Sequence, residues 1–126
     1  MKQLLQNITF KQSEQLAKMF GETAEKVAEI LQNRDNIKTT QFRKFYDKVL
    51  ELNQKAQTLS EEDFRVKVLP FVKMLNSKVA YAKTRRLCGN DFVTLMDISI
   101  KKVNNKEELQ NFKYFLESII GFMPKK

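Results

Sequence analysis

Apolar side chains recur three and four residues apart along almost the whole chain, and no segment shows the strict alternation of a half-buried strand. This spacing aligns apolar residues on one face of an α-helix, which has 3.6 residues per turn. Only three glycines and two prolines occur among the 126 residues, a length typical of one domain. The sequence therefore predicts a single all-α domain over residues 1–126, a compact bundle of about five helices joined by short loops.

Polar residues delimit the first two expected helices. The first helix is expected to end at Leu31, before a loop at residues 32–39, and Gly21 is a point at which it can divide. Its candidate N-caps are Thr9, Gln12 and Ser13. Thr40 is then a good N-cap for a second helix that runs to about Gln57.

The third expected helix begins at Ser60, because Ser60 and Asp63 have the spacing of a capping box. Pro70 either kinks this helix or marks the first turn of a new one, since proline lacks the backbone N–H and clashes with the preceding turn. The helical pattern then continues to Leu87, and we expect Gly89 to end it as a left-handed C-cap.

Two more helices complete the expected bundle. Asn90 is expected to cap a fourth helix through about Val103, which is apolar on most sides and should be the most buried. Asn105 and Glu108 repeat the capping-box spacing and predict a fifth helix. The residues expected to end this last helix are Gly121 and Pro124.

Basic residues are concentrated in one segment. The chain has 23 Lys and Arg against 15 Asp and Glu, a net charge of +8, and residues 64–90 carry seven basic side chains and no acidic ones. This segment accounts for seven of the eight excess charges, which favours a polyanionic partner. The alternative is a solvated helix face whose acidic complement comes from elsewhere in the fold.

The third helix separates into an apolar face and a basic stripe when its residues are placed at 100° intervals. Its expected core face consists of Val68, Val72, Leu75, Val79 and Ala82. The stripe steps by four, three and four residues through Met74, Lys78, Tyr81 and Arg85. Lysine and arginine neutralise phosphates, and a tyrosine between them can stack on a base, so the stripe is a candidate nucleic-acid-binding surface. Alternatively, Tyr81 packs at a bundle edge and the cations only border the core.

The second helix carries a lysine face of its own, formed by Lys44, Lys48 and Lys55. Such a face is usually only solvated, and it becomes a stronger candidate if it lies beside the stripe of the third helix. Arg43 follows the cap region, where backbone N–H groups are also free to bind an anionic oxygen. Arg43 and Asp47 have the spacing of a weak helical ion pair.

The composition excludes most familiar catalytic chemistry. The chain has no histidine, which removes histidine acid–base catalysis and His-containing metal sites, and its isolated glycines form no phosphate-binding loop. First-turn positions on a helix dipole explain the acidic residues 61–63 without a metal. Cys88, the single cysteine, allows no intramolecular disulfide. The dipole of the preceding helix favours a raised pKa for its thiol, Arg85 and Arg86 oppose this, and we interpret the residue as structural or incidental. With no apolar run of the roughly 20 residues that a membrane span needs, we expect a cytoplasmic protein with no catalytic residue, cofactor or metal.

Three segments of the chain are similar to segments of a known protein family and occur in the same order along the sequence. They are TTQFRKFY at residues 39–46, KVAYAKTR at 78–85 and FKYFLESIIGF at 112–122. In this order and at this chain length, they resemble the small helical subunit of type III-A CRISPR effector complexes, the Csm complexes, over roughly residues 10–123. The most telling element is the Lys-x-Ala-Tyr-x-x-x-Arg pattern of Lys78, Ala80, Tyr81 and Arg85. Thr84 stands where we expect a small residue, often glycine.

This resemblance implies a noncatalytic subunit that self-associates, as a filament of several copies or a dimer, beside guide RNA and target RNA. Target cleavage would belong to the backbone subunit, and DNase activity and cyclic-oligonucleotide synthesis to the large polymerase-like subunit. The protein would then contact RNA independently of sequence, because base pairing reads the sequence. The implied RNA-backbone contacts are Arg43, Lys78 and Arg85, followed by Lys44, Lys48, Tyr81 and Arg86. Candidates for self-association are the apolar residues Phe122 and Met123.

Two other functions are alternatives. In a helix-turn-helix regulator, residues 91–103 would form the recognition helix, but Asp91 would face the phosphates while Lys101 and Lys102 lie at the far end. In a basic adaptor bundle, the basic helix would dock an acidic protein. Salt-sensitive binding to a protein but not to RNA would favour the adaptor.

Overall fold

Every regular element in residues 1–123, the part of the chain that the computed structural model describes, is helical. In chain order the elements are α1 (Gln15–Lys18), η1 (Met19–Thr23), α2 (Ala24–Ile30), η2 (Leu31–Asp35), α3 (Thr39–Ala56), α4 (Glu61–Lys67), α5 (Leu69–Thr84), α6 (Asn90–Lys101) and α7 (Lys106–Phe122). The η elements are short π-helical stretches. The predicted all-α bundle is confirmed, and each of the five expected helical segments is present.

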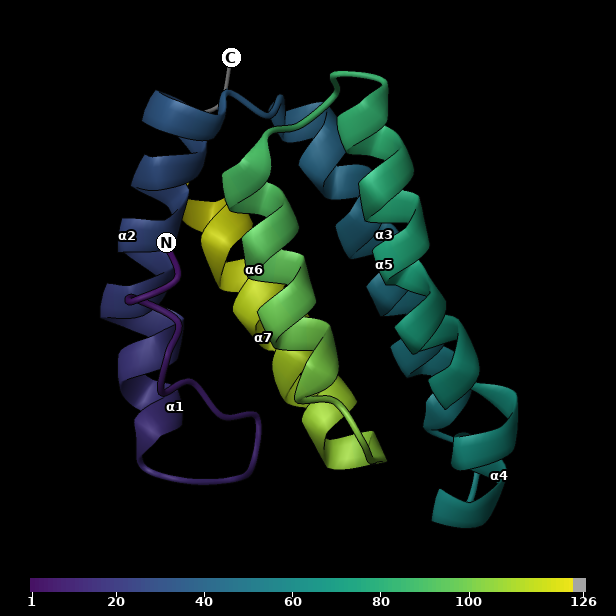
Figure 1. The fold of residues 1–126 in the computed structure, drawn as a ribbon. Helices are drawn as coiled ribbons and strands as arrows, with labels where there is room; N and C mark the ends of the chain where they lie inside the picture. The colour runs from purple at the N-terminus through teal and green to yellow at the C-terminus, as the bar shows by residue number, and fades with distance from the viewer. Residues whose placement is uncertain (124–126) are drawn as a thin grey trace.

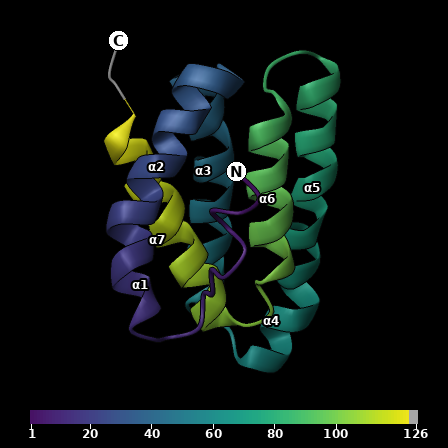
Figure 2. The same ribbon diagram turned by 60° about the vertical axis from the view of Figure 1, so that its left-hand side comes forward.

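The long helices lie side by side in two layers (Figure 1, Figure 2). In Figure 1, α2, α6 and α5 lie in front, and α7 and α3 lie behind them. α7 packs against α2 and α3, and α6 packs against α5. The N-terminal segment, residues 1–14, crosses the bundle between α1 and α6, where Phe10 packs against Phe112 and Phe115 of α7 at ring-centroid distances of 5.4 and 5.9 Å.

The first helical segment is one rod, because α1, η1, α2 and η2 follow one another without a break. Gly21 lies within η1 and does not divide the rod. The predicted loop at residues 32–39 is wrong at residues 32–35, which belong to η2, and at Thr39, which begins α3. The rod ends instead at Asn36, which adopts the left-handed conformation with φ 64°. Asparagine tolerates this conformation better than most side chains.

The capping predictions divide into right and wrong ones. Ser60 Oγ accepts a hydrogen bond from the N–H of Asp63 at 3.1 Å, and Asn105 Oδ1 accepts one from Glu108 at 2.8 Å, so both of these N-caps are confirmed. Pro70 lies in the first turn of α5, which is therefore a new helix. The predicted caps that the structure does not use are Thr9, Gln12, Ser13, Thr40 and Asn90. α1 begins after Glu14 and α3 after Lys38, in both cases without a side-chain cap; α6 begins after Gly89.

The turn between α5 and α6 differs from the prediction at Gly89. Gly89 is extended, with φ −109° and ψ −168°, and the left-handed residue is Arg86, with φ 62°. The N–H of Arg86 donates to the carbonyl of Lys83 at 2.9 Å, and the N–H of Leu87 donates to that of Ala82 at 2.9 Å. These two bonds form a Schellman motif, so α5 ends through Arg86.

α6 is the covered helix of the bundle, as predicted. No residue from Asp91 to Ile100 is exposed, and the ring of Phe92 packs 5.5 Å from that of Phe42 and 5.2 Å from that of Phe45. α7 continues through Gly121 to Phe122, so Gly121 does not end it, and Pro124 lies outside the described residues. None of the helices in residues 1–123 is long and apolar enough to cross a membrane.

Candidate nucleic-acid interface

α3 and α5 run antiparallel along one edge of the bundle (Figure 1). A groove of about 270 Å³ lies between them. It is lined by Lys48, Glu51, Leu52 and Lys55 of α3 and by Phe71, Met74, Leu75 and Lys78 of α5. Three lysines against one glutamate make the groove positive, while its leucines give it an apolar floor. The lysine face of α3 therefore does lie beside the stripe of α5. We name Lys44, Lys48, Lys55, Lys78, Tyr81 and Arg85 the α3–α5 surface.

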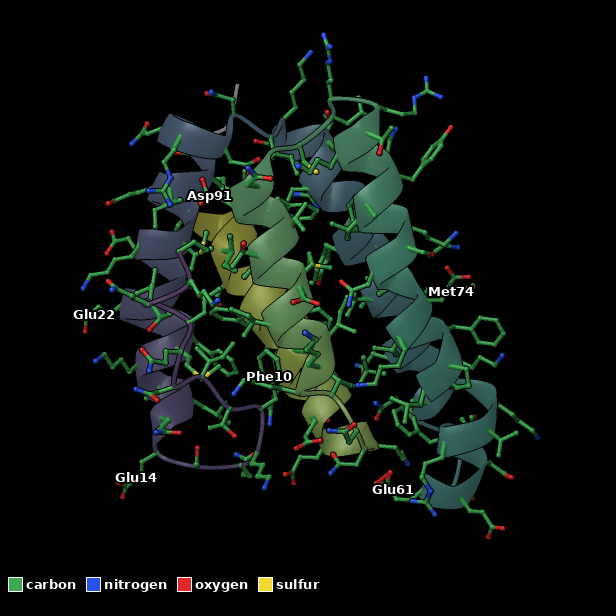
Figure 3. All side chains as sticks on the ribbon, viewed as in Figure 1. Phe10, Glu14, Glu22, Glu61, Met74 and Asp91 are labelled. Carbon is green, nitrogen blue, oxygen red and sulfur yellow. The ribbon has the colours of Figure 1, made fainter. Side chains whose placement is uncertain are left out.

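The two faces predicted for α5 are confirmed. All five residues of the expected core face are buried. The four stripe residues are exposed, and Met74 projects from the outer side of α5 (Figure 3). Tyr81 is 62% exposed, so it does not pack at a bundle edge as in the alternative interpretation.

Tyr81 and Arg85 form a pair on this surface. Arg85 Nη1 donates a hydrogen bond to Tyr81 Oη at 3.0 Å, and the guanidinium carbon lies 5.6 Å from the centre of the tyrosine ring. Residues four apart are neighbours on a helix, which is why α5 brings these side chains together. The pair restrains the aromatic ring and still leaves the charge of Arg85 exposed to solvent.

Arg43 lies apart from the α3–α5 surface. It is exposed, but it lies about 100° around the helix from Lys44, in the second turn of α3 and past the free backbone N–H groups. Burial raises the pKa of the neighbouring Tyr46, whose hydroxyl donates to Glu117 of α7 at 3.3 Å, and the charge of Arg43 opposes this rise. The expected Arg43–Asp47 ion pair is not among those formed within residues 1–123. Arg43 therefore lies on a different face of α3 from Lys44.

One of the seven basic residues in the 64–90 segment has an internal role. Lys73 Nζ donates to the carbonyl of Ile100 at 2.8 Å and to Asn104 Oδ1 at 3.4 Å, which ties α5 to the end of α6. Burial lowers the pKa of Lys73. Helix ends carry free carbonyls that a lysine can satisfy, so this cation serves the fold. Of the seven basic residues in the segment, at most six are therefore available to bind phosphates.

The last predicted contact, Arg86, is exposed in the turn after α5, at the end of the bundle. The groove-lining Phe71 was not predicted as a site residue. Phe71 lies seven residues before Lys78, and this two-turn spacing is the signal that places both side chains on one flank of α5.

The contacts of Cys88 and of the acidic residues 61–63 indicate structural roles. Cys88 is buried, and burial, with a contribution from Asp35, raises its pKa to about 11. Burial is therefore the main cause of the raised pKa. Glu61 accepts a hydrogen bond from the N–H of Lys106 at 3.0 Å. Residues 1–123 contain no group of three Asp, Glu, Cys or His side chains placed to hold a metal ion.

The fold and this surface define a small all-helical bundle with a basic edge formed by two antiparallel helices. The family model described as Csm2 Type III-A matches residues 13–123. The chain belongs to this family and is a Csm2-type small subunit of the type III-A CRISPR complex, which confirms the resemblance seen in the sequence. Family membership implies association with the other Csm subunits and with RNA. No curated protein and no solved structure matches the chain.

Proposed function

We propose that this chain is a noncatalytic, cytoplasmic subunit that binds the backbone of guide RNA paired with target RNA, and so serves antiviral defence. The observation that carries the proposal is the groove that brings Lys48 of α3 and Lys78 of α5 onto one surface. Cations from two packed helices keep a fixed spacing, which suits the regular phosphates of a duplex. No tight ion pair in residues 1–123 includes Lys78 or Arg85, and Lys48 reaches Glu51 only at 3.5 Å.

Sequence-independent contact follows from the chemistry of this surface. The deep, narrow major groove of an RNA duplex hides the base edges, so proteins read its phosphates and shape. Base pairing with the guide already supplies sequence recognition in RNA-guided complexes. Flexible lysines on a rigid helix pair are therefore sufficient for this role.

We also propose self-association through exposed apolar residues of α7, with backbone and large polymerase-like subunits as the other protein partners. Of the two residues predicted for self-association, Phe122 is 43% exposed, but Met123 is only 3% exposed and the prediction for it is wrong. Met123 packs into the core, so it cannot anchor a partner. Tyr114, partly exposed two turns before Phe122 on α7, takes its place as a candidate contact.

Binding of a labelled RNA duplex to the full chain across a salt series tests the RNA-binding proposal. We expect the Lys48→Ala/Lys78→Ala variant to bind more weakly and to reduce the slope of log affinity against log salt by about 2, because each phosphate contact contributes about 0.9. The matched control is Lys11→Ala/Lys18→Ala, which removes two exposed lysines elsewhere and should leave the slope nearly unchanged. Equal slopes in the two variants would show that the α3–α5 surface does not bind RNA.

The two alternatives receive less support. In the helix-turn-helix alternative α6 would enter the DNA groove, yet no residue from Asp91 to Ile100 is exposed, and Asp91 is paired with Arg34 at 2.6 Å. The same salt series addresses the adaptor alternative. Salt-sensitive capture of an acidic protein, with no affinity for RNA at low salt, would favour it over RNA binding.

A further inference from the structure

The three tyrosines of the chain lie in different surroundings. Tyr46 is partly covered, and its hydroxyl donates to Glu117. Tyr114 packs edge-on against Phe20, with ring centroids 6.1 Å apart. Tyr81 is the most exposed of the three, and none of the aromatic ring pairs within residues 1–123 includes it. The guanidinium of Arg85 lies over the ring, 5.6 Å from its centre. Because Tyr81 is still 62% exposed, its ring can take a partner from outside the chain.

Arg85 prepares this ring for binding. The hydrogen bond from Arg85 Nη1 to Tyr81 Oη holds the ring at its hydroxyl end. A side chain that is restrained before binding loses less conformational entropy when a partner orders it. Tyr81 is thus an exposed, restrained aromatic ring on a positively charged surface. Such a ring suits a ligand that has a flat aromatic group to stack on it and a negative charge nearby.

A nucleotide is such a group, and its base must be unpaired to reach the ring. Bases within a duplex are already stacked on both sides, so an aromatic side chain can stack only on a base that has left the helix or lies at a strand end. Lys78 lies three residues before Tyr81 and Arg85 four residues after it, so the helix places a cation about one turn away in each direction. These positions suit the phosphates on either side of one extruded nucleotide.

We propose that Tyr81 is a stacking site for one unpaired nucleobase of the bound RNA, with Lys78 and Arg85 on the flanking phosphates. This inference rests on the proposed function, because it concerns the same RNA-binding surface. It adds that the subunit prefers RNA with an extruded base over a continuous duplex.

The test compares two short RNA duplexes, one fully paired and one with a single bulged 2-aminopurine, in binding to the full chain. We expect wild type to prefer the bulged duplex by at least about fivefold, the lower end of base–aromatic stacking, and to quench the 2-aminopurine fluorescence. Tyr81→Leu should lose this preference and the quenching while it still binds the paired duplex. Tyr81→Phe should keep most of both, because it keeps the ring.

Val66→Ala is the control, since it removes an exposed apolar side chain from α4, and it should behave as wild type. Circular dichroism verifies that Tyr81→Leu is folded. Equal wild-type affinities for the two duplexes, or an unchanged preference in Tyr81→Leu, would overturn the stacking proposal while leaving backbone binding supported. Absence of wild-type binding to either duplex would overturn backbone binding and stacking together.

Discussion

The carboxylate of Asp35, at the end of η2, caps the start of α6, where its Oδ1 accepts a hydrogen bond from the backbone N–H of Phe92 at 2.8 Å. The other oxygen, Oδ2, accepts from the N–H of Gly89 at 2.9 Å. One side chain thus satisfies two N–H groups at a helix start, and it joins the first helical rod to α6.

Asp35→Ala should lower the free energy of unfolding by about 1–3 kcal/mol, because two partly buried N–H groups lose their acceptor. Urea denaturation followed by circular dichroism measures this change. Asp97→Ala is the control, since Asp97 is paired with Lys101 at 3.1 Å on the surface and should contribute only a few tenths of a kcal/mol. A loss for Asp35→Ala no larger than that of the control would contradict the capping role.

Gly89→Ala should also destabilise the fold, by about 1–3 kcal/mol, because an added Cβ would lie 2.9 Å from Asp35 Oδ1. The backbone of Gly89 is one that any residue adopts, so the cost arises from this contact. Gly121→Ala meets nothing within 4 Å inside α7 and should instead stabilise the chain by about 0.5–1 kcal/mol. Thermal or urea denaturation should therefore give opposite signs for the two substitutions. The same sign for both would be inconsistent with this packing.

These contacts show which parts of the fold the sequence predicts. The caps at Ser60 and Asn105 bond to N–H groups three residues away, so a short window of sequence contains both partners. The cap of α6 comes from Asp35, 54 and 57 residues from its partners, and no local pattern shows it. Glycine preference predicted the left-handed residue at Gly89, but α5 ends at Thr84, so the position after its C-cap is Arg86, which takes that conformation instead.

The candidate site, like the fold, is only partly predictable from the sequence. Periodicity predicts which residues share a face of one helix, and it correctly separates the core of α5 from the exposed stripe. Periodicity does not show how neighbouring helices pack against one another. This packing brings Lys48 and Lys78 to the same groove and places Lys73 at the carbonyl of Ile100. Arg43 is adjacent in sequence to Lys44, yet one residue is about 100° of rotation, enough to move it to another face.

Cys88 should react slowly with iodoacetamide in the native protein. Burial raises its pKa to about 11, and only the thiolate is nucleophilic, so the rate at pH 8 should be about two orders of magnitude below that of a free thiol. Because the pKa is raised, the rate should continue to increase up to about pH 11. Mass spectrometry measures the alkylation. Urea should restore the rate of an ordinary cysteine, whereas a native rate equal to that of free cysteine would contradict the burial.

The pair of Arg34 and Asp91 should make stability depend on acid pH. Arg34 donates to both carboxylate oxygens, at 2.6 and 2.8 Å, and this hydrogen bonding lowers the pKa of Asp91 below its ordinary value of 3.8. A group with a lowered pKa in the folded state contributes stability above its unfolded pKa and loses it as the pH falls through the folded value.

Arg34→Ala should therefore be slightly less stable than wild type at pH 7, and the difference should shrink as the pH falls below 3.8. The effect is small because Arg34 is largely exposed and solvent screens the pair. Urea denaturation at several pH values measures it. Lys11→Ala, which removes an exposed lysine that is in none of the ion pairs within residues 1–123, is the control for a lost surface cation. A difference for Arg34→Ala that stays constant down to pH 2 would contradict the role of the pair.

Arg86→Gly should separate stability from RNA binding. Arg86 adopts φ 62°, which costs a residue with a side chain about 1 kcal/mol relative to glycine, so the substitution should raise the free energy of unfolding by about that amount. If the exposed arginine contacts RNA, the same variant should bind an RNA duplex more weakly. Arg86→Ala keeps the left-handed strain and removes the cation, so it should lose affinity without the gain in stability. An arginine at a position where glycine is favoured makes the fold less stable. If Arg86→Gly raises the free energy of unfolding and lowers the affinity for RNA, the arginine is present at this position because it binds RNA. Unchanged affinity in both variants would remove Arg86 from the set of RNA contacts.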